Sequence, residues 1–252
     1  LIRQADLESE RIVVRSELEG RENEPGSLLF TELMAAAYKA HPYQWPVIGW
    51  RADIERITAE ELRQYYHTYY LPNNATLVIA GDVTPDGVKA LAEKYYGPLK
   101  PSDGIVPRER PQEPPQLAER RITLADERVS EPYIFRTYLA PERDPGDQKD
   151  AAALTVLAEL LGGNGQTSVL ARALQFDTQT AVYSAAFYDG TSIDDGTFGV
   201  VVTPAQGVSL ADAEAALDKV LADFLKTGPD AAALERIRTQ VRASEIYARD
   251  NV

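Results

Sequence analysis

The stretch TAEELRQYYHTYYLPNNATLVIAGDVTPDGVKALAEKYY, residues 58–96, holds the densest set of folding signals in the chain. Thr58 followed by Glu61 is a capping box, which predicts a helix that starts here and ends near residue 70. Residues 75–80 are short, apolar and rich in β-branched side chains, which predicts a buried strand. The Thr-Pro pair that opens residues 84–96 is typical of a second helix start. The stretch is therefore expected to fold as helix, strand, helix.

The chain divides on either side of this stretch into two expected units. Residues 1–100 form the first, and residues 101–117 are a linker because prolines, glycines and charged residues replace apolar ones there. Residues 118–252 form the second. The expected strands are 119–126, 131–140, 179–188 and 196–204, and the other expected helices are 1–22, 27–39, 146–161, 167–175, 209–227 and 230–248. This order predicts an α+β protein of two units.

Composition excludes several classes of protein. The 252 residues carry a net charge of −13 and no cysteine. The negative charge excludes a nucleic-acid-binding protein, because no basic stripe is present to replace phosphate counterions. Without cysteine there is neither a disulfide framework nor a thiolate metal site. No apolar run approaches the ~18 residues of a membrane span. The chain begins at Leu1 without a methionine, and we expect residues upstream to be missing.

Two carboxylates on the first expected helix are the chemically interesting residues. Glu10 and Glu17 are seven residues apart, which places them on one face of a helix about 10 Å apart along its axis. On a helical wheel they share a stripe with Leu7 and Val14. Carboxylates in an apolar stripe need a positive partner, and a metal ion is one. The alternative is a solvated face, since other glutamates lie nearby.

Ordered motifs add a family resemblance. Residues 10–17, ERIVVRSE, resemble the Glu-Arg-x-x-Val-x-x-Glu helix of the pitrilysin and mitochondrial-processing-peptidase family of zinc metallopeptidases. Further motifs follow in the order of that family: His41-Pro42-Tyr43, Pro46-Val47-Ile48-Gly49, Asp53-Ile54, Tyr69-Tyr70, Pro72-Asn73-Asn74-Ala75-Thr76-Leu77-Val78 and Gly81-Asp82-Val83. Residues 118–252 resemble the family's non-catalytic domain more loosely. The resemblance implies two related domains, each a mostly antiparallel sheet packed with helices, of which residues 1–100 would be the C-terminal part of the catalytic one.

The resemblance also implies a zinc site. The family places two zinc ligands and a general base in a His-x-x-Glu-His motif, with a glutamate downstream as third ligand. Glu17 corresponds to that ligand, and Glu10 to a second carboxylate that supports it. The zinc ion polarises the scissile carbonyl and acidifies its bound water. The His-x-x-Glu-His motif is absent from this sequence, and its two histidines, His41 and His67, are expected to be structural. This chain alone is therefore expected to be inactive and without tightly bound zinc.

One departure from the family concerns substrate contacts. Many members carry, in the non-catalytic half, an arginine seven residues before a tyrosine, and this pair binds the substrate. Tyr183 occupies the tyrosine position, but Phe176 stands where the arginine would be. The resemblance thus implies a peptide substrate and a sibling subunit in a heterodimer, with a homodimer as the alternative.

Taken together, these features predict part of a bacterial zinc metalloendopeptidase that hydrolyses peptides in a chamber between two homologous halves. The alternative is a non-catalytic family member that acts as a scaffold or binds peptides. A periplasmic or cell-envelope location is expected in preference to the cytoplasm. An acidic peptide-binding module without peptidase ancestry would leave the ordered motifs unexplained.

Overall fold

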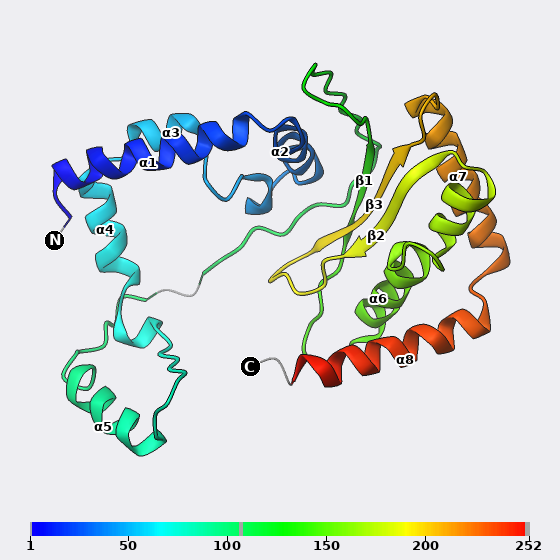
Figure 1. Cartoon of the computed structure of the whole chain (residues 1–252). Coiled ribbons are helices and arrows are strands. Elements are labelled where there is room, and N and C mark those ends of the chain that lie inside the picture. Colours follow the sequence, from blue (N-terminus) through cyan, green and yellow to red (C-terminus); the bar gives the residue numbers. More distant parts are fainter. Residues whose placement is uncertain (1, 106–107, 250–252) are drawn as a thin grey trace. The chain divides into compact units, whose positions relative to one another are not determined.

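The computed structural model describes residues 2–105 and 108–249. The chain divides into two compact units, Leu1–Gln112 and Glu113–Val252, and each is described by itself (Figure 1). The division lies within residues 101–117. No helix among the described residues is long and apolar enough to cross a membrane.

The described residues of the first unit form helices joined by turns and extended segments. The α-helices are α1 (Gln4–Glu22), α2 (Pro25–Ala37), α3 (Arg51–Arg56), α4 (Ala59–Tyr69) and α5 (Pro85–Tyr95), and the 3₁₀ turns are η1 (Pro42–Gln44) and η2 (Pro72–Asn74). The capping box is confirmed. The Thr58 hydroxyl accepts the Glu61 N–H at 3.2 Å, and the Glu61 carboxylate accepts the Thr58 N–H at 2.8 Å.

The strand expected at residues 75–80 is not formed. These residues are extended but pair with no other strand among the described residues of this unit, and Val78 is 82% exposed. A strand is stable only beside a hydrogen-bonding partner. The apolar, β-branched residues therefore suit a strand, but the described part of this unit contains no sheet for them to join.

The second unit is an α+β layer structure, as predicted. Its elements are β1 (Ile134–Ala140), α6 (Lys149–Gly162), the π-helix η3 (Ala171–Asp177), β2 (Ala181–Tyr188), β3 (Gly196–Pro204), α7 (Leu210–Thr227) and α8 (Ala231–Ala248). The sheet is antiparallel with the order β1-β3-β2, in which Phe135 lies opposite Val201 and Ala186 opposite Val200. The helices α6, η3 and α7 pack on this sheet (Figure 1).

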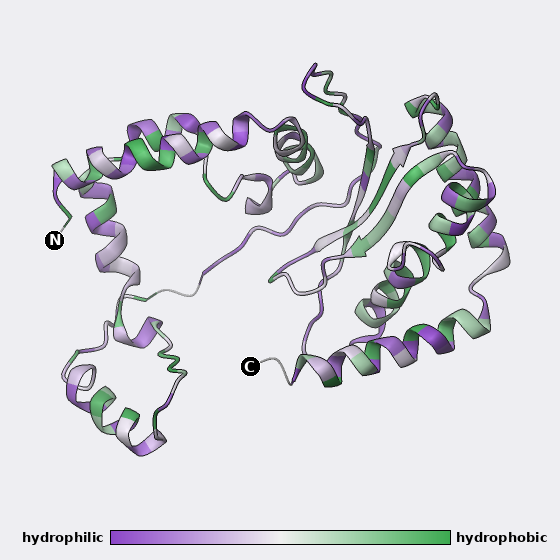
Figure 2. Cartoon of the chain, in the orientation of Figure 1, coloured by the Kyte–Doolittle hydropathy of each residue, from purple (hydrophilic) through white to green (hydrophobic). Residues whose placement is uncertain are grey.

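The core of the second unit lies between the sheet and these helices. Alternate residues of β3, among them Val200 and Val202, point into it and are fully buried together with Leu170, Leu174 and Leu217. The helices of this unit alternate between polar and apolar residues, as expected for one buried face each (Figure 2).

The strand expected at residues 119–126 is also absent. This segment is irregular and exposed, and it is held by charge instead of by strand pairing. The Arg121 guanidinium donates to Glu214 on α7 at 2.9 and 2.7 Å. Among the described residues this segment pairs with no strand of the sheet, so the expectation of a strand here is wrong.

Candidate functional site

The helix α1 presents Glu10 and Glu17 to solvent. Its inward side is formed by Leu7 and Leu18, which are buried, and by Val14, which is half-buried. The two carboxylates therefore flank the apolar stripe, and the expectation that they share it is corrected. The physical reason is that an ionised carboxylate without a partner keeps its hydration when the helix can turn it outward.

Arg11, which the sequence analysis named only as part of the Glu-Arg motif and without a role, takes the polar position on the inward side. Its guanidinium donates from Nε to the carbonyl of Ile54 at 3.2 Å and from Nη2 to the carbonyl of Ile57. Both carbonyls belong to the C-terminal end of α3, where backbone acceptors lack partners within the helix. Arg11 therefore ties the middle of α1 to the end of α3.

A second arginine, Arg51, connects the start of α3 to the end of α1. Arg51, the first residue of α3, donates to Glu22 at 2.5 Å and lies 3.5 Å from Glu19, both in the C-terminal part of α1. The hydrogen bond to Glu22 raises the pKa of Arg51 above its ordinary value. The two contacts, one at each end of α3, show that α1 and α3 run in opposite directions.

The two exposed glutamates are chemically available. Neither Glu10 nor Glu17 forms an ion pair or a side-chain hydrogen bond with another described residue, in contrast to Glu19 and Glu22 beside them. A catalytic zinc site takes three protein ligands. Within residues 2–105 and 108–249 no three histidine, cysteine, aspartate or glutamate side chains lie together as such a set. Glu17 fits one oxygen ligand, and the described residues do not complete the site.

The histidines pack against aromatic rings. His41 is buried, its ring centroid lies 4.3 Å from that of Tyr43, and its Nδ1 accepts the Tyr43 N–H at 3.2 Å. His67 is exposed on α4 with its ring against Tyr66. Both positions fit the structural roles expected of them.

The residues expected to contact substrate lie on the second unit. Tyr183 projects from β2 and is 53% exposed, and Phe176 projects from η3 and is 56% exposed. Tyr183 lies with Phe187 on the side of the sheet opposite α6 and α7, and the Phe187 ring covers Gly199 and lies 5.5 Å from the ring of Phe135. This side of the sheet is thus aromatic.

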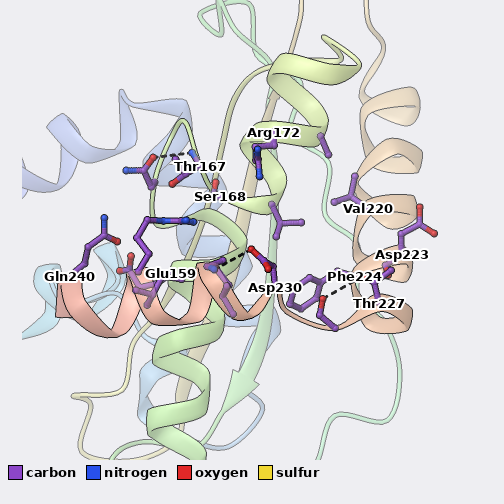
Figure 3. Close-up of a pocket in the computed structure, with 18 residues that line it drawn as sticks. Glu159, Thr167, Ser168, Arg172, Val220, Asp223, Phe224, Thr227, Asp230 and Gln240 are labelled. Carbon is purple, nitrogen blue, oxygen red and sulfur yellow. Dashed lines mark hydrogen bonds between the residues drawn. The ribbon is translucent and has the colours of Figure 1, made fainter. Parts of the chain in front are cut away.

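A cavity of about 340 Å³ in the second unit was not foreseen from the sequence. It lies where the end of α6, η3, the end of α7 and the start of α8 meet (Figure 3). Phe224 and Ile237 contribute apolar walls, and the Asp230 carboxylate, at the start of α8, accepts the N–H groups of Ala232 and Ala233. Because four elements far apart in sequence form it, no local pattern announces it.

Comparison with known proteins identifies relatives along most of the chain. The family described as "Peptidase M16 inactive domain" matches residues 56–241. The zinc protease PqqE of Helicobacter pylori is 32% identical over 163 residues, covering 64% of this chain and 36% of that protein. An uncharacterized zinc protease of Mycobacterium leprae is 28% identical over 229 residues, covering 88% of this chain and 49% of that protein. The chain thus spans between a third and a half of the length of these relatives.

Solved structures give the same result for the fold. A protease from Helicobacter pylori matches with a TM-score of 0.82 and 26% identity, covering 98% of this chain and 59% of that one. The periplasmic protease PqqL from Escherichia coli matches with a TM-score of 0.79 and 19% identity, covering 99% of this chain and 27% of that one. These likenesses show the fold, and the family match over residues 56–241 shows that the chain belongs to the peptidase M16 family.

Proposed function

We propose that this chain is part of a zinc metalloendopeptidase in which Glu17 is a zinc ligand and Glu10 supports it from the same side of α1. One observation carries the proposal: two exposed carboxylates, which have no partner among the described residues, lie seven residues apart on a helix whose opposite face is anchored. The zinc-protease names of the relatives support it.

The remaining zinc ligands would come from residues upstream of Leu1, in keeping with the greater length of the relatives. When bound, zinc supplies a Lewis acid and an acidified water molecule. The contribution of this chain is to hold one carboxylate oxygen of Glu17 at the ligand position and the negative charge of Glu10 about 10 Å away along the same side of α1.

Peptides or unfolded proteins are the proposed substrates, enclosed between two homologous halves of the enzyme. Residues 1–100 would complete the catalytic half, and residues 118–252 would form the non-catalytic half. A ferredoxin protease with a similar fold has been crystallised in complex with ferredoxin, and this supports a protein substrate. The periplasmic location of one structural neighbour supports a periplasmic or cell-envelope location.

A non-catalytic scaffold is the second candidate function. The observation that favours it is the extent of the family match, which covers residues 56–241 and is described as an inactive domain. Glu10 and Glu17 lie outside that range. A scaffold subunit has no use for two carboxylates held without partners on one side of a helix, so their role separates the two candidates.

The decisive experiment compares glutamate variants of the full-length protein. Glu17→Gln keeps the shape but removes the charge, so zinc content and peptidase activity should both be lost. Glu10→Gln should keep more zinc and lose activity about 10- to 100-fold, as is typical of residues that support a ligand. Glu8→Gln, on the same helix, is the control and should match the wild type. Bound zinc with full activity in Glu17→Gln would require another ligand, and a wild type without zinc would support the scaffold.

A further inference from the structure

The guanidinium of Arg11 makes the directional contact between α1 and α3 that lies nearest to Glu10. Its Nε and Nη2 donate to two different carbonyls, those of Ile54 and Ile57, at the end of α3. A planar group that uses two donors at once fixes both its position and its orientation. The positive charge also complements the negative end of the α3 dipole.

Helical geometry links this contact to both glutamates. At about 100° per residue, Glu10 lies about 100° to one side of Arg11 around the axis of α1. Glu17, six residues after Arg11, lies about 120° to the same side, within about 20° of Glu10. Any rotation of α1 about its axis therefore moves both carboxylates together, and Arg11 is placed to prevent that rotation.

The apolar contacts of α1 are less suited to this task. Leu7, Val14 and Leu18 gain from burial, which depends on area and has little directional preference. A rotation of about 20° at a side-chain radius of about 5–6 Å displaces a carboxylate by about 2 Å. Zinc ligands tolerate about ±0.2 Å, and a misplacement of about 1 Å in an active site can cost about 100-fold in rate.

We propose that Arg11 is a positioning residue, which sets the rotation of α1 and so aims Glu10 and Glu17 at the metal site. This inference rests on the proposed zinc peptidase function. It differs from a role in stability alone, because it predicts that losing Arg11 changes metal binding and turnover by more than the loss of stability explains.

The test uses the full-length protein with Arg11→Met, Arg11→Lys and a matched control, Arg63→Met. Arg63 also donates to a backbone carbonyl, that of Ile2 at 2.9 Å, but this carbonyl precedes α1. Arg11→Met should weaken zinc binding at least about 10-fold and lower kcat about 10- to 100-fold at unchanged KM. Arg11→Lys, which offers a point charge without a planar fork, should recover stability before it recovers kcat. Arg63→Met should lose comparable thermal stability with zinc binding and kcat intact.

A second readout is independent of zinc. Residues 1–252 contain no cysteine. With any cysteine outside this range changed to serine, spin labels at Ser16→Cys on α1 and Ala52→Cys on α3 report the distance between these two helices. The distance distribution should broaden or shift in Arg11→Met and remain as in the wild type in Arg63→Met. Equal zinc binding, kcat and distance distributions in the two variants would overturn the role of Arg11. A wild type without zinc would instead overturn the proposed function, and the spin-label comparison would still decide whether Arg11 sets the rotation of α1.

Discussion

At the scale of single residues, arginine side chains connect segments that no backbone hydrogen bonds join. Arg121 connects the irregular segment 119–126 to Glu214 on α7, and Arg136 on β1 reaches the same carboxylate at 3.1 Å and Asp218 at 2.6 Å. Two cations thus share one acceptor. The hydrogen bond from Arg121, followed by that from Arg136, lowers the pKa of Glu214 below its ordinary value.

This arrangement predicts a pH-dependent contribution to stability. Because the pKa of Glu214 is lower in the folded state than in the unfolded state, its stabilisation is present above the unfolded value of about 4.3 and is lost as the pH falls through the folded value. Glu214→Gln should lower the free energy of unfolding by about 1 kcal/mol at pH 7. The difference from wild type should shrink below about pH 4, as measured by urea denaturation across pH.

Glu142→Gln provides a control with the opposite sign. Burial raises the pKa of Glu142, so its charged form opposes folding above that pKa, and the amide should leave stability at pH 7 unchanged or slightly raised. Equal effects of the two substitutions at pH 7 would mean that Glu214 adds no specific stabilisation.

At the scale of elements, Gly162 sets how closely α6 approaches β2. A β-carbon at this position would lie 1.9 Å from the backbone nitrogen of Ala186 and 2.4 Å from the carbonyl carbon of Ala185. Alanine in a helix ordinarily stabilises by about 0.5–1 kcal/mol relative to glycine. Here the clash is with backbone atoms, so Gly162→Ala should instead destabilise the second unit by about 3 kcal/mol. Thermal unfolding measures the difference.

Gly165→Ala is the matched control, three residues away. A β-carbon there meets no atom within 4 Å, so its melting temperature should stay near that of the wild type. If Gly162→Ala unfolds at the wild-type temperature, α6 and β2 can separate without cost and the close packing is not a constraint.

Elements with local signals could be predicted from the sequence, and those that depend on distant partners could not. The helix starts at Thr58 and Ser209 carry their own caps, and both were predicted. The strands expected at 75–80 and 119–126 are not formed, because the sequence of a segment does not say whether a partner strand is available to pair with it. The positions of Glu10 and Glu17 on one helix could be predicted, but their exposure depends on the packing of α1 against α3.

At the scale of the whole molecule, the two units differ in how much core they hold. The large buried cluster, which includes Leu170, Val202 and Leu217, lies entirely in the second unit. In the first unit, many apolar side chains of α4, the 75–80 segment and α5 are exposed. Residues 113–252 produced alone should therefore unfold in one cooperative thermal transition, followed by circular dichroism, whereas residues 1–112 alone should not. A cooperative transition of residues 1–112 alone would show that this unit folds stably without contacts that bury its exposed apolar side chains.

The side chain of Phe176 bears on whether the protein works with a partner subunit. This exposed side chain stands where the family resemblance places an arginine, and a phenyl ring offers no hydrogen-bond donor to a substrate backbone or carboxylate. If that donor is required for turnover, we propose that a second chain supplies it. A homodimer would present the same phenylalanine twice, so we expect a heterodimer with a sibling subunit that carries the arginine.

Peptidase activity of the purified full-length protein should be low and should rise when the sibling is added. An Arg→Ala change in the sibling should abolish this gain. A Tyr183→Phe change in this chain removes only the hydroxyl group. If Tyr183 contacts the substrate through that group, KM should rise. Full activity of the single subunit would contradict the need for a partner and would leave the role of Glu17 untouched, because zinc content is measured separately.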